Sequence, residues 1–129
     1  MRLTIGEGLS SFYRINCEKI KGAARAVWVN QAIADEIASE AMQILEQASK
    51  ANFRFFSGKS PKCILGGLFY ILGFKFKAIK TQREIASFLC TTEVSICKSY
   101  NSWMNEFPYY FTDEAILKMY ILKKVKILF

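Results

Sequence analysis

The fold is decided by residues 81–103, TQREIASFLCTTEVSICKSYNSW. The stretch begins with a capping-box pattern, because Thr81 and Glu84 stand three residues apart and can each bond a backbone N–H group of a first helical turn. Apolar residues at helical spacing follow, which favours a short helix. A break is expected at Cys90, and Thr92 is a candidate cap for a second helix.

The second helix of this stretch has two different faces. Its apolar stripe consists of Ile96, Tyr100, Trp103 and Phe107. Its other stripe, again at i, i+3, i+4 and i+7, consists of Val94, Cys97, Lys98 and Asn101. A short helix, a turn and a longer helix, with the small Ala86 at the crossing, are typical of a helix-turn-helix, expected over about residues 81–104. This arrangement presents the outer face of the second helix to the DNA major groove, although simple helix packing remains an alternative.

The segments before residue 81 are also predicted to be helical. Apolar residues recur at spacings of three to five over residues 10–28, and Asn30 is a candidate N-cap for a second helix. A third helix is expected to begin at Ser60–Pro61, with serine as cap and proline in the first turn. Residues 63–72 are apolar on every side, which predicts a central helix surrounded by others. The pair Gly66–Gly67 indicates close approach of a neighbouring helix. Because all these segments are predicted to be helical, the expected fold class is all-α.

The sequence changes character after Pro108. Residues 112–114 are candidates to cap a final segment, which we expect to be a helix or strand packed on the domain or on a partner. A basic amphipathic segment at a membrane surface is the alternative. We therefore expect one domain over residues 1–107 and a C-terminal extension over residues 108–129. The extension carries Ile116, Met119, Tyr120, Leu122 and Ile127, with Lys118, Lys123, Lys124 and Lys126.

Charge and composition narrow the classes of partner. Hydrophobic residues make up 52% of the 129 residues and charged residues 22%, which excludes a disordered tail or a collagen-like repeat. The formal net charge is +7, and no acidic residue lies between Glu46 and Glu84. Such a basic block favours a polyanionic partner, with a solvated basic face as the alternative. The block contains Lys50, Arg54, Lys59, Lys62, Lys75, Lys77, Lys80 and Arg83.

The residues that are absent argue against an enzyme. The chain has no histidine, which excludes Ser-His-Asp and Cys-His nucleophilic arrangements. Its four cysteines lack C-x-x-C spacing and neither glycine-rich phosphate-binding motif occurs, so we expect no metal and no cofactor. Free thiols without a secretory signal predict a reducing, intracellular compartment. The longest apolar run, residues 63–74, is too short to span a bilayer, so no membrane partner is expected.

Four segments together resemble the second cyclin-like repeat of transcription initiation factor IIB, especially its archaeal form. They are SGKSPK at 57–62, LFY at 68–70, TQREIA at 81–86 and TEVSICKSY at 92–100. The strong resemblance covers about residues 57–104, and a weaker one extends back to about residue 12.

This resemblance implies a cyclin fold of five helices around the third, in which the fourth and fifth form the helix-turn-helix. In the family, this repeat reads a promoter element upstream of the TATA box, beside the TATA-box-binding protein, during recruitment of RNA polymerase. The implied partners are double-stranded promoter DNA, the TATA-box-binding protein and RNA polymerase, with the chain as a monomer. The implied location is the archaeal cytoplasm, associated with the nucleoid, or the nucleus of a eukaryote.

The resemblance also implies two sets of DNA-contacting residues. The first lies at and along the recognition helix: Thr92, Glu93, Val94, Cys97, Lys98 and Asn101. The second is expected to face phosphates: Lys59, Lys62, Thr81, Gln82 and Arg83. An exposed valine at the base-contacting position can pack against a thymine methyl group.

The sequence departs from the family in ways that affect function. Family members usually carry arginine where this chain has Cys97, and cysteine cannot make the bidentate contact with guanine that arginine makes. The N-terminal zinc ribbon and first repeat of full-length members do not fit in 129 residues, so we expect a fragment or a reduced paralogue. These departures predict non-specific or weakly specific DNA binding with steep salt dependence. The alternative is a cyclin-like protein–protein interaction module, which the apolar tail at 116–129 also favours.

Overall fold

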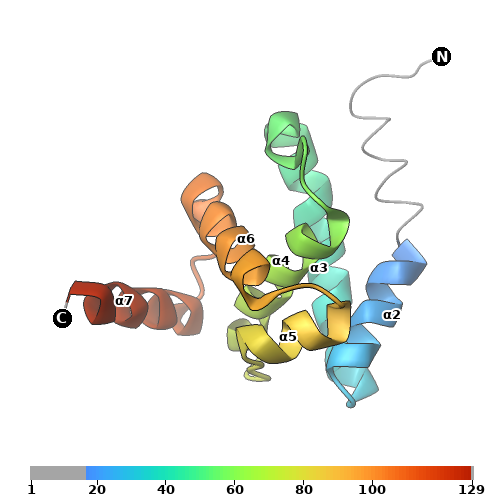
Figure 1. Ribbon diagram of the computed structural model, residues 1–129. Helices are drawn as coiled ribbons and strands as arrows, with labels where there is room; N and C mark the ends of the chain where they lie inside the picture. Colours follow the sequence, from blue (N-terminus) through green and yellow to red (C-terminus); the bar gives the residue numbers. More distant parts are fainter. Residues whose placement is uncertain (1–16, 129) are drawn as a thin grey trace.

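The computed structural model describes residues 17–128, and their side chains from Glu18 to Lys123. The helices are α2 (Cys17–Val27), α3 (Gln31–Ala51), α4 (Pro61–Lys75), α5 (Gln82–Leu89), α6 (Glu93–Glu106) and α7 (Glu114–Leu128), with 3-10 turns η1 (Phe53–Phe56) and η2 (Pro108–Tyr110) (Figure 1). No strand occurs among the described residues, so the all-α prediction is confirmed. The predicted first helix of residues 10–28 is observed from residue 17, and its earlier part lies outside the described residues.

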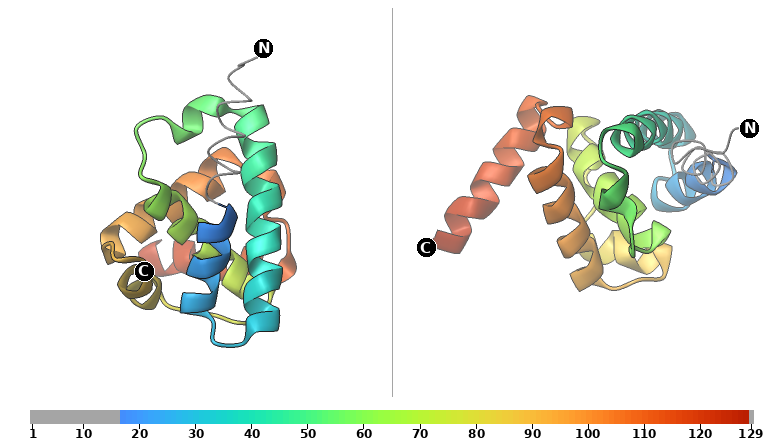
Figure 2. Two further views of the ribbon diagram at one scale, coloured as in Figure 1. Left: turned by 90° about the vertical axis from the view of Figure 1, so that its right-hand side faces the viewer. Right: turned by 90° about the horizontal axis from the view of Figure 1, so that it is seen from above.

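Helices α2 and α3 lie side by side and form one wall of the domain (Figure 2). The predicted N-cap of α3 is confirmed, because the Asn30 side-chain oxygen accepts hydrogen bonds from the backbone N–H groups of Ala32 at 3.0 Å and Ile33 at 3.2 Å. One side of α3 is buried at helical spacing, and Ile37, Ala41, Ile44, Leu45 and Ala48 all belong to it. The inner face of this wall is therefore apolar.

Helix α4 is the centre of the fold, as its uniformly apolar sequence predicts. It contacts α3, α5, α6 and α7, and Ile64 and residues 66–73 are buried. Pro61 is in the first turn as expected, and Ser60 has the extended backbone of a cap residue. The Ser60 side chain, however, makes no capping hydrogen bond, so the predicted cap is formed by position and not by the hydroxyl group.

The two central glycines of α4 allow α6 to approach closely. A Cβ atom on Gly66 would overlap Cδ1 of Ile96, and one on Gly67 would lie 2.7 Å from the backbone carbonyl carbon of Ser99. Any larger residue would push α6 away from α4. The predicted role of this glycine pair is confirmed, and α6 is the helix that it accommodates.

The segment after Pro108 forms helix α7, which packs against α4 and projects from the other helices (Figures 1 and 2). The Asp113 carboxylate accepts a hydrogen bond from the Ala115 backbone N–H at 3.1 Å. Ile116 and Met119 are buried, whereas the exposed side chains of α7 include the apolar Leu117, Ile121 and Leu122. The division of the chain at residue 107 stays a prediction. Within residues 17–128 no helix combines the length and the apolar character needed to cross a membrane.

Candidate nucleic-acid interface

The entrance of α5 is stabilised by the capping box that the sequence predicts. The Thr81 hydroxyl accepts a hydrogen bond from the Glu84 backbone N–H at 3.0 Å, and the Glu84 carboxylate accepts one from the Thr81 backbone N–H at 2.9 Å. The bond from the Thr81 backbone lowers the pKa of the Glu84 carboxyl. The Thr81 hydroxyl, predicted to face phosphate, is thus already bonded within the domain.

The turn between α5 and α6 is set by a left-handed residue, Cys90, with φ of 58°. Its backbone N–H bonds the Ala86 carbonyl, and the Thr91 N–H bonds the same carbonyl at 2.9 Å. This αL geometry ends α5 and redirects the chain toward α6. The predicted break is confirmed, and it occurs at a residue whose Cβ makes positive φ unfavourable.

Thr92 begins α6 as a side-chain cap. Its hydroxyl oxygen accepts a hydrogen bond from the Ser95 backbone N–H at 3.1 Å, and the hydroxyl donates to the Ser95 side chain at 2.9 Å. The prediction that Thr92 caps the second helix is therefore confirmed.

The inner face of α6 is fully buried. Ile96 and Trp103 are 0% exposed, and the Trp103 indole N–H donates to the Ile64 carbonyl of α4 at 2.9 Å. Tyr100 lies between them, and burial raises the pKa of its phenol. Together with Phe107, these residues are the apolar stripe that the sequence predicts, so the rotation of α6 about its own axis is fixed.

The outer face of α6 is divided between free and engaged side chains. Val94 is 62% exposed and Lys98 is exposed as well. Cys97 and Asn101 are half-buried, and the Asn101 amide donates to the Cys97 carbonyl at 3.0 Å and lies 3.6 Å from its sulfur. Of the four residues on the predicted stripe, Val94 and Lys98 are therefore the most available to a ligand.

Two predicted DNA-contacting residues form an ion pair. The Arg83 guanidinium of α5 lies 3.7 Å from the Glu93 carboxylate at the start of α6, and both side chains are largely exposed. An exposed pair of this kind contributes roughly 0–1 kcal/mol and is readily opened. Sequence analysis missed this pair, because the two residues are ten positions apart across a turn and no helical spacing relates them.

The remaining predicted phosphate contacts are dispersed. The Lys59 ammonium lies 3.8 Å from the centre of the Phe55 ring, a cation–π contact outside the helix-turn-helix. Lys62 is exposed on the first turn of α4, which adjoins the turn of the motif because the Cys63 sulfur lies 3.7 Å from the Thr91 hydroxyl. Gln82 is the half-buried first residue of α5.

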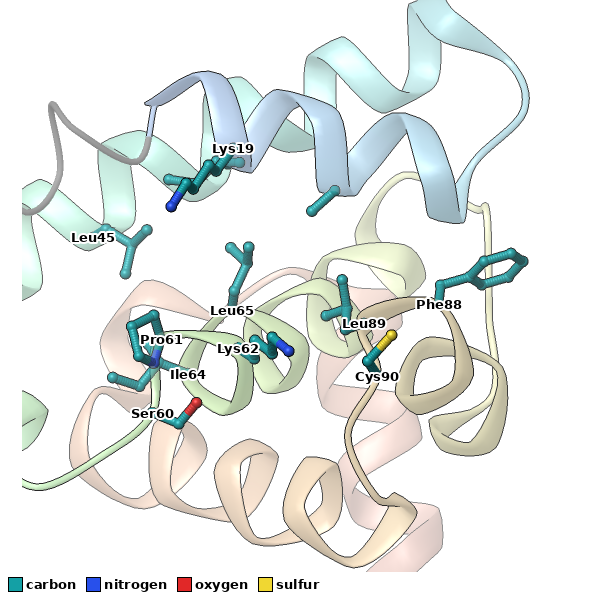
Figure 3. Close-up of a pocket in the computed structure, with 12 residues that line it drawn as sticks. Lys19, Leu45, Ser60, Pro61, Lys62, Ile64, Leu65, Phe88, Leu89 and Cys90 are labelled. Atoms are coloured by element: carbon teal, nitrogen blue, oxygen red, sulfur yellow. The ribbon is translucent and has the colours of Figure 1, made fainter.

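Sequence analysis also missed an apolar cavity of about 520 Å³, lined by side chains of α2, α3, α4 and α5 (Figure 3). Lys62 lies at this cavity as well as near the turn. Periodicity identifies the apolar face of each helix, but it does not tell whether facing side chains fill the space between them. In the part of the chain that the structure describes, no group of three or more histidine, cysteine or acidic side chains is placed to hold a metal.

Comparison with known families adds to this geometry. A family model described as the transcription factor TFIIB repeat matches residues 16–106, a range that contains α2 to α6. Neither the curated proteins nor the solved structures include a match to the chain. The family match and the packing of α3, α5 and α6 around α4 agree on a cyclin-like fold. The chain thus belongs to the family of TFIIB repeats, the cyclin-like helical domains of a transcription factor.

Proposed function

We propose that the helix-turn-helix of this TFIIB repeat binds double-stranded promoter DNA next to the TATA box and supports assembly of the preinitiation complex. One observation carries the proposal: α6 is fixed by a buried inner face while Val94 and Lys98 stand exposed on its outer face. A helix held in this way can enter the major groove without rearranging the domain.

The two exposed residues suit different parts of a DNA site. Val94 offers a methyl-bearing surface for a thymine C5-methyl group, which is an apolar contact to a base edge. Lys98, one turn further along α6, offers an ammonium for a phosphate. We therefore assign base contact to Val94 and phosphate contact to Lys98.

The basic block between Glu46 and Glu84 supports a polyanionic partner, although less strongly than its composition suggests. Lys50 pairs with Glu46, Lys75 with Glu40 and Arg83 with Glu93. Pairing reduces the field that these three cations present to DNA. Arg54, Lys59, Lys62, Lys77 and Lys80 form no ion pair within the described residues.

Binding is expected to be weakly specific. Cys97 cannot form the bidentate guanine contact of arginine, and Asn101 already donates to its own helix. Phosphate contacts then supply most of the affinity, which falls steeply with salt. The TATA-box-binding protein and RNA polymerase are the proposed protein partners, on the strength of the family. An archaeal-type second repeat, acting as a monomer at the nucleoid, is the proposed setting, and a eukaryotic protein would act in the nucleus.

A salt-resolved gel shift tests DNA binding. The probe is an A·T-rich promoter duplex, with and without TATA-box-binding protein, and the variants are Lys98→Glu and, as a matched control on α7, Lys118→Glu. Loss of one phosphate contact lowers the slope of log affinity against log salt by about 1. We expect this change for Lys98→Glu and little change for the control. Equal effects of the two variants, or an isotherm that barely moves with salt, would refute the proposal.

Specificity has its own test at Cys97. We expect Cys97→Arg to gain discrimination for guanine of about 1–3 kcal/mol at one position of the site, because it restores a bidentate donor. Selection from a randomised duplex measures the change, with Ser102→Arg, a half-buried position one turn from Lys98, as the control. Identical selected sequences for wild type and Cys97→Arg would mean that this position does not face the bases.

A protein–protein interaction module is the second candidate function. It is favoured by the exposed apolar residues of α7, since Ile121 and Leu122 are 59% and 60% exposed. If Lys98→Glu leaves the gel shift intact while Ile121→Asp abolishes retention of the TATA-box-binding protein, the interaction module explains the function better than DNA binding does.

A further inference from the structure

The apolar interior of the cavity is not part of the proposed DNA-binding surface. It lies between α2 and α4, on the side of α4 away from α6, with the end of α5 closing one edge (Figure 3). Its walls include Ile20 of α2, Leu45 of α3, Leu65 of α4 and Leu89 of α5. Its volume of about 520 Å³ falls in the range of small-molecule pockets, roughly 300–1,000 Å³.

The two charged residues of the lining are both lysines. Lys19 extends from α2 and Lys62 from the first turn of α4, and the side chain of Leu65 stands between the two helices (Figure 3). None of the lining residues is acidic. Within the described residues neither lysine forms an ion pair, whereas Arg25, Lys50, Lys75 and Arg83 do. A mainly apolar lining whose two charged residues are both unpaired lysines is complementary to an apolar molecule that has one anionic end.

The shape favours a small molecule over a peptide helix. A helix docks along a groove through anchors spaced over several turns. Here the apolar lining comes from four helices that surround one space, and the ring of Phe88 lies at its edge, 48% exposed. A flexible alkyl chain suits such a space better than a helix does.

We propose that this cavity binds a free amphiphile made of one linear alkyl chain and one carboxylate. The chain lies among Leu45, Leu65 and Leu89, and the carboxylate lies between the ammonium groups of Lys19 and Lys62. The proposal does not rest on DNA binding by the outer face of α6, and Lys62 is the one residue that it shares with the predicted phosphate contacts.

Calorimetric titration of the full chain with decanoate tests the proposal. Acetate has the same head group without the chain, and decyltrimethylammonium has the same chain with the opposite charge. We expect saturable binding of decanoate at one site per chain, no binding of acetate, and at least about tenfold weaker binding of the cation. Absence of decanoate binding, or equal affinity for the two amphiphiles, would overturn the proposal.

Three variants locate the site. Ala23→Trp places a large ring in the cavity and should abolish binding. The double variant Lys19→Gln/Lys62→Gln should weaken decanoate binding about fivefold and strengthen binding of the cationic amphiphile, since it removes the attraction for the one and the repulsion of the other. Lys118→Gln, an exposed lysine on α7, should bind like the wild type. Circular dichroism melting checks that each variant folds.

Two results would contradict this assignment. If Ala23→Trp folds and still binds decanoate with wild-type affinity, the amphiphile occupies another place. If an acidic amphipathic peptide binds more tightly than decanoate and loses that binding in Ala23→Trp, the cavity serves a protein partner instead.

Discussion

The two sides of α4 are built in opposite ways. Toward α6 the helices are in direct contact, because Gly67 leaves no room for even a methyl group beside the Ser99 backbone. Toward α2 the same helix borders a cavity of about 520 Å³. The two sides of α4 therefore differ in how closely the neighbouring helix packs.

The two sides of α4 therefore have different roles: one holds α6 in place, and the other leaves space for a ligand. The α6 side fixes the helix whose outer face carries Val94 and Lys98, so its packing determines how that face is presented. The α2 side leaves space, and substitutions there should change stability less. Of the four predictions below, ordered from the largest expected effect to the smallest, the first two test this contrast and the other two test the helix entrances.

The largest difference in the free energy of unfolding is expected between the variants Ile96→Ala and Leu65→Ala. Ile96 is 0% exposed and packs against Gly66, so truncation removes contacts and opens a void, at a cost of about 3 kcal/mol. Leu65 is half-buried and already borders the cavity, so its truncation costs about 1 kcal/mol. Urea unfolding curves measure both values. Equal costs would show that the two sides of α4 are packed alike.

Substitution of glycine by alanine should change the stability of the fold in opposite directions at two sites. Gly67→Ala forces α6 away from α4 and should destabilise the fold by about 1–3 kcal/mol, despite the better helix propensity of alanine. Gly22 lies within α2 with open space around its Cβ position, so Gly22→Ala should stabilise by up to about 1 kcal/mol. Thermal melting distinguishes the signs, and stabilisation by Gly67→Ala would disprove close contact with α6.

Removing the cap residues of α5 and α4 should give a smaller difference in the free energy of unfolding. Thr81→Ala removes a hydroxyl that accepts a hydrogen bond from the Glu84 backbone and should cost about 1 kcal/mol. Ser60→Ala removes a hydroxyl that makes no capping bond, so its effect should be within about 0.5 kcal/mol. The same urea curves provide the measurement. A cost at Ser60 equal to that at Thr81 would mean that the serine hydroxyl caps α4 in solution.

The smallest effect concerns pH. The pKa of the Glu84 carboxyl is lowered in the folded state, mainly by the hydrogen bond from the Thr81 backbone. This stabilisation is fully present above the ordinary carboxylate pKa and is lost as the pH falls through the lower folded-state value. Glu84→Gln should therefore show a shallower loss of stability in that acidic range than the wild type. Identical acid profiles in melting experiments would exclude a contribution from this carboxyl.

Local signals in the sequence predicted much of the fold. The capping box at Thr81, the caps at Asn30 and Thr92 and the break at Cys90 each depend on neighbouring residues, and all four are observed. The glycine pair of α4 was also interpretable, because two adjacent glycines inside an apolar helix indicate a close neighbour.

The candidate site was less predictable because its state depends on contacts between elements. No spacing rule relates Arg83 to Glu93, which meet only when α5 and α6 cross. The engagement of Asn101 with Cys97, four residues earlier in α6, had a detectable i, i+4 spacing. The cavity had no such signal in the sequence, since it depends on how far apart α2 and α4 lie and not on the apolar face of either helix.

The chain contains two tryptophans, and the fold puts one on each side of α4. Trp103 belongs to α6 and donates to the Ile64 carbonyl, while Trp28 follows α2, donates to the Ala78 carbonyl at 2.7 Å and meets the Phe69 ring edge-on. Each indole is thus a fluorophore buried in only one of the two contacts. The variant Trp103→Phe keeps only Trp28 and reports on the α2 side, whereas Trp28→Phe keeps only Trp103 and reports on the α6 side. Early separation of α2 from the domain would then change the fluorescence emission of Trp103→Phe and not that of Trp28→Phe.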